Sequence, residues 1–259
     1  MFSFGRNWKE FAKVALSSER VDQARVDFQA LFNGIPLAGK RFLDVGFGQG
    51  LSLHLAMESS ADVIGIDIDP PNFEALKVTA SFFPNLSEPK VECISILDAD
   101  WVEAHAGKFQ VVHSWGVLHH TGSLDVAFRN CVRLLDPDQG TLVVALYRKH
   151  WSSPAWSLVK KVYNLVPRPL SLLMVWLLIP IIFIAKFLVT WENPLKKERG
   201  MSFFFDVIDW VGGYPYEYRS QSEVQRLAAA SGLTLVKFRQ SQVPTGCNEY
   251  VFKGNGSTN

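Results

Sequence analysis

Nine residues near the start of the chain, Phe42 to Gly50, restrict its fold more than any other segment. They read Phe-Leu-Asp-Val-Gly-Phe-Gly-Gln-Gly, which is an apolar strand with an acidic residue followed by a Gly-x-Gly-x-Gly turn. A second apolar run, Val63 to Ile66, ends at Asp67, 21 residues after Gly46. A strand, a glycine turn, a helix and a second strand in this spacing predict a βαβ unit that binds a nucleoside at the turn.

The position of the third glycine argues against a dinucleotide. In a dinucleotide-binding turn it falls where this chain has Leu51, because the helix must pack closely beside the pyrophosphate, whereas Gly50 comes one residue earlier. Asp44 stands two residues before the first glycine, where a carboxylate repels a pyrophosphate and attracts an ammonium group. Asp67 ends the second strand, where a carboxylate can accept both ribose hydroxyls. The pattern favours a nucleoside with an ammonium group and no phosphate.

With these residues the sequence resembles the class I S-adenosylmethionine-dependent methyltransferases. The resemblance implies S-adenosylmethionine as cofactor and an α/β fold, a Rossmann-like doubly wound sheet of seven strands with the last one inserted antiparallel. It extends over nearly the whole chain to a largely uncharacterised bacterial family of such enzymes. The further segments that carry it are Phe4-Gly5-Arg6-Asn7-Trp8, residues 199–217 and Gly246-Cys247-Asn248-Glu249-Tyr250.

The predicted cofactor contacts come from several segments. Asp98 follows the third strand, where the family places an acidic acceptor for the adenine amino group. The backbone from Ser114 to Gly116, after the fourth strand, is predicted to line the methionine part, and Trp8 to close over the cofactor. The predicted cofactor-binding residues are Trp8, Asp44, Gly46, Phe47, Gly48, Gly50, Asp67, Ile68, Leu97, Asp98, Ser114 and Trp115.

Elements alternate along the chain as in a doubly wound sheet. Strands are predicted at 41–45, 62–66, 91–95, 110–114, 140–146, 233–238 and 249–252. Helices are predicted at 21–32, 50–58, 72–82, 123–135 and 222–231. Residues 1–146 and 218–259 are then predicted to form the cofactor-binding domain, and residues 147–217 a helical cap inserted after the fifth strand, over the ligand crevice.

The cap is basic and apolar. From Tyr147 to Arg199 there are nine basic and two acidic residues, a formal charge of +7 in a chain whose total is +1. Leu170 to Ala185 carries no charge, and Trp176 and Trp191 suit a membrane interface. Three interpretations stay open: burial against the catalytic domain or in a homodimer, a helix dipping into the inner leaflet of the membrane, and a true span. A single crossing conflicts with the return of the last strands to the sheet.

Composition limits the remaining classes of protein. The chain has 259 residues, 48% of them hydrophobic, which suffices for one large core. Three widely spaced cysteines indicate a reducing compartment and no metal cluster, and the first 18 residues have no signal-peptide core. We therefore expect a cytoplasmic protein, with membrane association left open. The total charge of +1 does not favour nucleic-acid binding.

Methyl transfer needs an acceptor held in line with the methyl group, exclusion of water and, for a hydroxyl, amine or thiol, a base. His119 and His120 follow the fourth strand and are the first candidates for that base. Tyr147, Asp206 and Asp209 are the next catalytic candidates, together with Glu217. Asp206 and Asp209 are three residues apart and share one helical face.

The leading hypothesis is methylation of a small or lipophilic acceptor, with oxygen favoured over nitrogen or sulfur, because an apolar cap suits a hydrophobic substrate. An RNA or protein methyltransferase that uses the basic insertion is the second hypothesis, and a non-catalytic cofactor-binding subunit is the third. The sequence leaves the acceptor molecule open.

Overall fold

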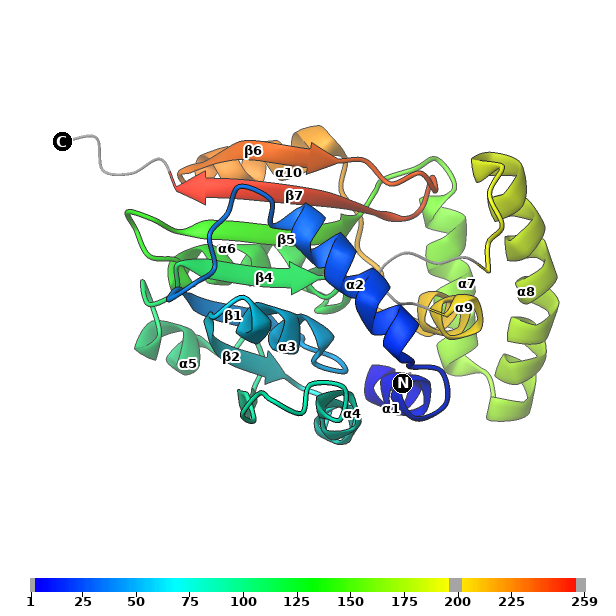
Figure 1. Cartoon of the computed structure of the whole chain (residues 1–259). Coiled ribbons are helices and arrows are strands. Elements are labelled where there is room, and N and C mark those ends of the chain that lie inside the picture. The colour runs from blue at the N-terminus through cyan, green and yellow to red at the C-terminus, as the bar shows by residue number, and fades with distance from the viewer. Residues whose placement is uncertain (1–2, 196–201, 255–259) are drawn as a thin grey trace.

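The chain folds around a seven-stranded sheet with the strand order β3-β2-β1-β4-β5-β7-β6 (Figure 1). The computed structural model describes residues 3–195 and 202–254. Strand β7 runs antiparallel to β5 and β6, and the other neighbouring strands are parallel, which confirms the predicted topology. The strands are β1 Arg41–Val45, β2 Asp62–Asp67, β3 Lys90–Cys93, β4 Val111–Trp115, β5 Thr141–Tyr147, β6 Leu233–Arg239 and β7 Cys247–Gly254.

Helices cover both faces of the sheet. One face carries α2 (Ser18–Leu31), α3 (Leu51–Glu58) and α4 (Pro71–Ala80), and the other carries α5 (Ala99–Ala104), α6 (Leu124–Leu134) and α10 (Gln221–Ala230). Separate clusters of buried apolar side chains fill the two interfaces. Strand β5 is buried on both sides, and its sequence is therefore almost continuously apolar rather than alternating.

Three helices of the insertion lie beyond the carboxyl ends of the parallel strands (Figure 1). They are α7 (Ser153–Leu165), α8 (Arg168–Thr190) and α9 (Phe203–Gly212), and we call them the cap. Val175 and Ile182 of α8 pack with Phe203, Val207 and Val211 of α9 in a small core of their own. The N-terminal helix α1 (Phe4–Val14) contacts both α4 and α9. The cap and α1 therefore enclose the edge of the sheet where ligands bind in this architecture.

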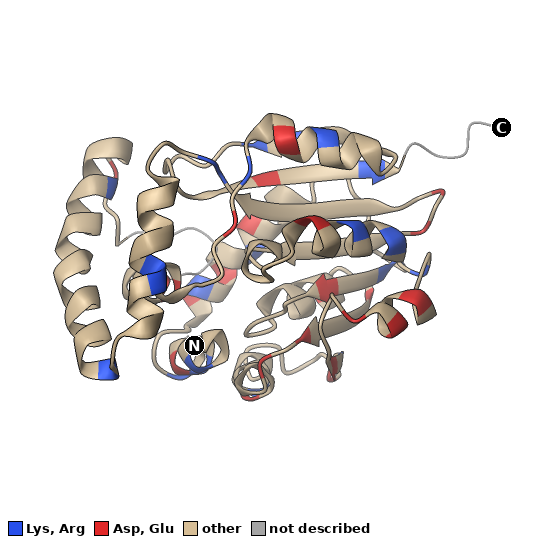
Figure 2. Ribbon diagram, turned by 180° about the vertical axis from the view of Figure 1, so that it is seen from behind, with Lys and Arg blue, Asp and Glu red and all other residues tan. Residues whose placement is uncertain are grey.

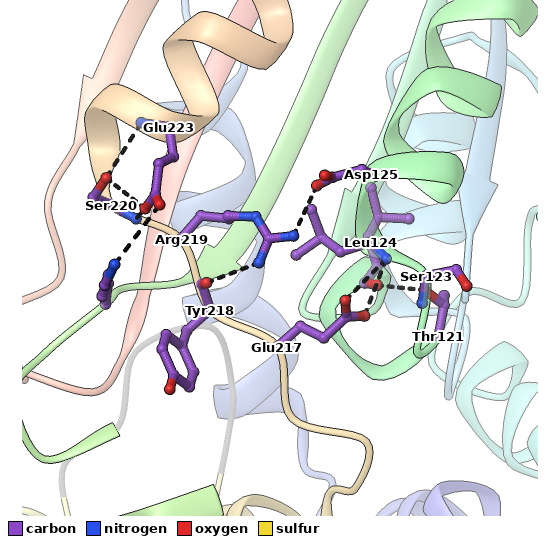
Figure 3. Close-up of polar contacts among 11 residues, drawn as sticks. Thr121, Ser123, Leu124, Asp125, Glu217, Tyr218, Arg219, Ser220 and Glu223 are labelled. Atoms are coloured by element: carbon purple, nitrogen blue, oxygen red, sulfur yellow. Dashed lines mark hydrogen bonds and ion pairs between the residues drawn. The ribbon is translucent and has the colours of Figure 1, made fainter. Parts of the chain in front are cut away.

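The segment that leads from the cap back to the sheet is tied to the core by polar contacts (Figure 3). The Glu217 carboxylate accepts hydrogen bonds from the Leu124 N–H, at 3.0 and 3.3 Å, at the start of α6. Arg219 pairs with Asp125 at 3.0 Å. Glu217, a candidate base in the sequence, thus caps a helix where a carboxylate is favoured by the helix dipole.

Candidate active site

A cavity of about 1230 Å³ lies at the carboxyl edge of the sheet, between the strands and the cap. Its walls come from segments far apart in the sequence: α1, the glycine turn, the ends of β2 and β3, the loop after β4, α7 to α9 and the connection from β6 to β7. Its volume exceeds that of typical small-ligand pockets, so it can hold a nucleoside and a second molecule side by side. We call the part at the glycine turn the donor end and the part beneath the cap the acceptor end.

The glycine turn at the donor end is built for close approach of the backbone. Gly46 has φ +73° and Gly50 has φ +78°, a left-handed conformation that side chains rarely adopt. A Cβ atom at Gly46 would lie 2.5 Å from Val117, and one at Gly50 would lie 2.0 Å from Leu76. Only glycine therefore allows α3 to start at this point and pack against α4.

Asp67 marks the end of β2 and lies on the cavity wall, 7% exposed. Its carboxylate accepts hydrogen bonds from the Gly48 N–H at 3.0 Å and the Asp69 N–H at 2.9 Å. Burial raises the pKa of this carboxyl, against the lowering effect of those hydrogen bonds. A buried carboxylate gains from further donors, and two ribose hydroxyls fit that need.

Asp44 lies on the cavity wall and is paired with His113, which the sequence did not single out. The two residues are partners in the β1–β4 register, and His113 Nδ1 is 2.7 Å from the Asp44 carboxylate. Both side chains are buried. The contact depends on which strand lies beside β1, which is a matter of sheet topology. The predicted contact of Asp44 with the cofactor ammonium stays a prediction.

Helix α1 is held over the donor end by Asp69, in the loop between β2 and α4. The Asp69 carboxylate accepts hydrogen bonds from the Gly5 N–H at 2.7 Å and from Ser3 Oγ at 3.0 Å. Trp8 consequently faces the glycine turn, and a Cβ atom at Gly48 would lie 3.6 Å from the Trp8 Nε1 atom. The tether puts the Trp8 indole on the cavity wall.

His120 lies on the wall of the acceptor end in one defined tautomer. Its Nδ1 lies 2.6 Å from the Pro215 carbonyl oxygen, which can only accept, so Nδ1 carries the proton and Nε2 keeps its lone pair. Burial, followed by the positive charge of Lys160, lowers the pKa of His120 to about 3. Gly213 makes room for the ring, because a Cβ atom there would lie 2.7 Å from His120 Cε1.

His119 has a different environment from its neighbour. Its ring is fully buried, lies against the Tyr147 ring at an interplanar angle of 39° with ring centroids 3.9 Å apart, and accepts the Tyr147 backbone N–H through Nδ1 at 3.3 Å. It is not among the residues that line the cavity. Of the two, Tyr147 lines the cavity and His119 lies behind it, and the catalytic role predicted for His119 stays a prediction.

The two cap aspartates line the cavity with different partners. Asp206 forms an ion pair with Lys186 of α8 at 3.0 Å. Asp209 accepts a hydrogen bond from Asn7 Nδ2 of α1 at 3.2 Å, and burial raises its pKa to about 7. These contacts join α9 to both α8 and α1, so the aspartates hold the roof of the acceptor end together.

Three predicted cofactor residues lie off the cavity wall. Asp98 caps α5, where its carboxylate accepts the Trp101 N–H at 2.9 Å. Ser114 donates from Oγ to the Val45 carbonyl at 3.1 Å and stabilises the β1–β4 pair. Gly50 begins α3. The other nine predicted cofactor residues line the cavity: Trp8, Asp44, Gly46, Phe47, Gly48, Asp67, Ile68, Leu97 and Trp115.

Sequence reasoning missed several wall residues that the fold brings in from afar. Trp156 of α7 and Trp210 of α9 meet with ring centroids 4.4 Å apart. Glu249 of β7 was also missed; it accepts a hydrogen bond at 2.8 Å from Nε1 of Trp115, which was predicted. Trp210 and Glu249 lie in segments that carry the resemblance to methyltransferases, but that resemblance gave them no role.

Comparison with known proteins identifies the type of domain. A family model described as a methyltransferase domain matches residues 19–206. A ubiquinone biosynthesis O-methyltransferase of Rhodopseudomonas palustris (strain HaA2) is 31% identical over 129 residues, covering 49% of this chain and 47% of that protein. The mitochondrial ubiquinone biosynthesis O-methyltransferase of Homo sapiens is 31% identical over 137 residues, 52% of this chain and 37% of that protein. The chain thus spans about half or less of the length of these relatives.

Solved structures agree on the fold at much lower identity. Magnesium protoporphyrin IX methyltransferase from Synechocystis PCC 6803, with bound SAH, covers 92% of this chain and 83% of its own at 14% identity, with a TM-score of 0.55. An O-methyltransferase family protein from Burkholderia thailandensis covers 92% of this chain and 57% of its own at 12% identity, with a TM-score of 0.59. These similarities establish a Rossmann-like fold.

Proposed function

The chain belongs to the family of methyltransferase domains, and we propose that it transfers a methyl group from S-adenosylmethionine to an oxygen atom of a small or lipophilic acceptor. The observation that carries this proposal is the neutral His120 imidazole, whose Nε2 keeps its lone pair in a cavity that continues to the glycine turn. The names of the sequence relatives, ubiquinone biosynthesis O-methyltransferases, support oxygen and a lipophilic acceptor.

At the donor end, the chain's own residues bind and orient the cofactor. S-adenosylmethionine supplies a methyl group that its sulfonium has already activated. The Asp67 carboxylate is available to the ribose, and Asp44 attracts the ammonium group of the methionine part. Trp8, held by the tether of α1 to Asp69, excludes water from this end.

At the acceptor end, His120 Nε2 takes the proton of the acceptor hydroxyl. The low pKa of His120 keeps the imidazole neutral at the working pH, so Nε2 can accept the proton, but it also makes the imidazole a weak base that assists rather than dominates the reaction. The indoles of Trp156 and Trp210 and the Tyr147 ring surround the acceptor with apolar surface. Holding the oxygen in line with the methyl group in a dry site supplies most of the rate enhancement expected of such an enzyme.

A panel assay tests the methyl transfer. The protein is incubated with labelled S-adenosylmethionine and with alkylated phenols, fatty acids, alkylamines and alkylthiols of matched chain length. We expect transfer to oxygen acceptors with a long alkyl chain, and weak transfer to the amine and the thiol. Turnover restricted to RNA or protein substrates would refute the proposal.

We further propose that the acceptor reaches the enzyme from the cytoplasmic surface of a membrane, with α8 lying in the lipid interface. Helix α8 is long and apolar enough to cross a membrane by length and composition, and only 11% of its most apolar window is buried. Leu173, Trp176, Leu177 and Ile181 are among its exposed side chains. In Figure 2 its ribbon is uncharged along most of its length. An exposed apolar surface of this kind suits lipid.

Interface binding is favoured over a crossing by the topology. Strand β5 precedes the cap and β6 and β7 follow it in the same sheet, so the chain enters and leaves the cap on one side. Helix α8 also packs along α9 through Val175 and Ile182. The inner side of α8 meanwhile lines the cavity through Ile182, Ala185 and Val189, so the lipid-facing helix also borders the active site.

Vesicle flotation tests the membrane proposal. With vesicles of phosphatidylglycerol and phosphatidylcholine, we expect the protein to float, and the double variant Leu173→Asp/Leu177→Asp to bind about tenfold or more weakly. Val126→Asp, an exposed apolar residue of α6, is the matched control and should bind like the unaltered protein. The opposite result has two parts: the unaltered protein does not bind vesicles but forms a stable homodimer, and the double variant is a monomer. It would show that α8 is a protein interface instead.

The basic character of the cap does not favour a phosphate-binding function. Lys160 is buried and Lys186 is paired with Asp206. Lys196, Lys197 and Arg199, which contribute to the charge of +7 in the sequence, lie outside the described residues. RNA binding that weakens steeply as salt is added would support the alternative, an RNA methyltransferase that uses the basic insertion.

A further inference from the structure

Lys160, on the inner face of α7, is a buried cation surrounded by aromatic rings. Its side chain is 0% exposed. The ammonium nitrogen lies 4.6 Å from the ring centroid of Trp210, 4.7 Å from that of Tyr216 and 5.6 Å from that of Tyr147. Among the described residues it has no hydrogen-bond partner. The rings stabilise the positive charge through their faces but leave all three N–H donors unused.

The two carboxylates that act electrostatically on Lys160 have other side chains as partners. Asp206 pairs with Lys186, and Asp209 accepts from Asn7. Both act on Lys160 only through space, by raising its pKa, while burial acts more strongly and lowers it to about 7. Burying a cation without a counter-ion is strongly unfavourable. An anion that arrives with a ligand would relieve that cost.

The charge of Lys160 is close enough to the cavity to act on its contents. Two of the three surrounding rings, those of Tyr147 and Trp210, line the acceptor end. Trp156, one helical turn before Lys160, lines it as well. Lys160 also lowers the pKa of His120, which lies on the same wall. The positive charge thus lies directly behind the wall that faces the acceptor.

We propose that Lys160 is a positioning residue that selects acceptors with an acidic oxygen, a phenol or a carboxylic acid, and favours the ionised form of that oxygen in the cavity. The proposal deepens the proposed function and rests on it. In the step, the acceptor O–H gives its proton to His120 Nε2. A lone pair of the oxygen forms the bond to the methyl carbon, and the electron pair of the broken C–S bond goes to sulfur. The proton then leaves His120 for solvent.

Other titratable groups near Lys160 shape the same field and must be kept in the test protein. Those of the cap helix α9 are acidic, the histidine and tyrosine side chains of the other elements are neutral when Lys160 is charged, and Cys247 raises the pKa of Lys160 through space. They are Asp206 and Asp209 of α9, His119 and His120 before α6, Tyr147 of β5, Tyr216 before α10 and Cys247 of β7.

A chromophoric acid measures the effect without turnover. An alkylated 4-nitrophenol is bound in the presence of S-adenosylhomocysteine, and its ionisation is followed by visible absorbance across pH. We expect the pKa of the bound phenol to lie about one unit or more below its value in water, since unit charges a few ångströms apart across the wall interact by that amount. Lys160→Met should remove the shift, and Lys161→Met, its exposed neighbour on α7, should keep it.

Met suits the aromatic surroundings, so the Lys160→Met variant should fold, with S-adenosylhomocysteine binding as the check. A second measurement compares kcat/KM for an alkylphenol, a fatty acid and a long-chain alcohol. We expect Lys160→Met to lower the value at least tenfold more for the phenol or the fatty acid than for the alcohol. A merely structural role would lower all three alike.

The proposal is overturned if the bound nitrophenol keeps its aqueous pKa in the unaltered protein, or if Lys160→Met leaves the shift in place. These outcomes are separate from failure of the proposed function. Absence of methyl transfer to every oxygen acceptor, with the Lys160-dependent shift intact, would refute the methyl transfer and retain the anion site.

Discussion

The donor and acceptor ends of the cavity are built in different ways. The donor end takes Asp44, the glycine turn and Asp67 from one continuous βαβ stretch, and its shape follows from backbone conformations that only glycine adopts easily. The acceptor end takes His120, Tyr147, Trp156 and Asp209 from four separate elements. The difference suggests that a common donor fits a locally fixed turn, whereas acceptor choice depends on how a cap packs. The following variants test that separation, from the largest expected effect to the smallest.

Gly50→Ala should disrupt the donor end altogether. The new Cβ atom would lie 2.0 Å from Leu76 at a φ of +78°, so we expect a loss of about 3 kcal/mol or more in the free energy of unfolding and no detectable binding of S-adenosylhomocysteine. Gly39→Ala is the control, with φ +70° and no atom within 4 Å of the new Cβ. It should lose only about 1–2 kcal/mol. Thermal unfolding and calorimetry measure both, and equal losses would contradict the steric explanation.

His120→Gln should separate the two ends. Loss of the base should lower kcat about 10²–10⁴-fold while the affinity for S-adenosylhomocysteine stays the same. His105→Gln, at the C-cap of α5, is the control. Because the pKa of His120 is about 3, its imidazole is protonated only when the pH falls toward that value. We therefore expect no acid limb from His120 in kcat/KM above pH 5; a limb near pH 6.5 that disappears in His120→Gln would contradict this assignment.

Asp67→Asn should weaken cofactor binding without changing the fold. Removing a charged acceptor from ribose hydrogen bonds costs about 1.5–3 kcal/mol, or roughly tenfold to a hundredfold in affinity. Asp62→Asn, at the exposed start of the same strand, should have no effect. Isothermal calorimetry with S-adenosylhomocysteine gives both affinities. If kcat at saturating cofactor falls while the affinity for S-adenosylhomocysteine is unchanged, the role of Asp67 is not confined to binding at the donor end.

Lys160→Met should stabilise the free protein by about 1 kcal/mol or more, because it removes an unpaired buried charge. The folded pKa of Lys160 is lowered to about 7 from 10.5, so the unfolded chain binds more protons between these values and stability rises with pH there. The rise should disappear in Lys160→Met.

Asp209 changes the stability with pH in the opposite direction to Lys160, so the two residues can be compared within one protein. Its folded pKa is raised to about 7 from 3.8, so its stabilising contribution is complete below pH 3.8 and is lost as pH rises through 7. Asp209→Asn should remove the fall in stability between pH 3.8 and about 7 and leave the rise above pH 7 unchanged. Urea unfolding from pH 4 to 10 measures how the free energy of unfolding changes with pH in each range. If neither variant alters this dependence, the pKa shifts assigned to the two buried groups are wrong.

Much of the fold could be predicted because its signals are local. Strand β1 was predicted with its observed bounds, and β2, β4 and β5 within one residue, since buried parallel strands read as apolar runs. Helix α10 begins one residue before the prediction, where the Ser220–Glu223 capping box places its first turn. The short helix α5 was missed, because six residues carry too little periodicity.

The candidate site was predictable to a different degree at its two ends. Nine of the twelve predicted cofactor residues line the cavity, while Asp98, Ser114 and Gly50 lie off its wall, where Asp98 caps α5, Ser114 bonds to Val45 and Gly50 begins α3. His119 and His120 look equivalent in the sequence, and their roles diverge only through contacts with Tyr147 and Pro215. Such contacts join residues 28 and 95 positions apart, which no local pattern reports.

The sequence alone determined the donor end, because left-handed glycines and a strand ending in a carboxylate are properties of consecutive residues. Lys160 and Lys161 mark the limit of that information. They are adjacent and identical in type, yet one is buried among three rings and the other is exposed. Only tertiary packing decided which of the two faces α9, since the rotation of a helix about its axis is fixed by what packs against it.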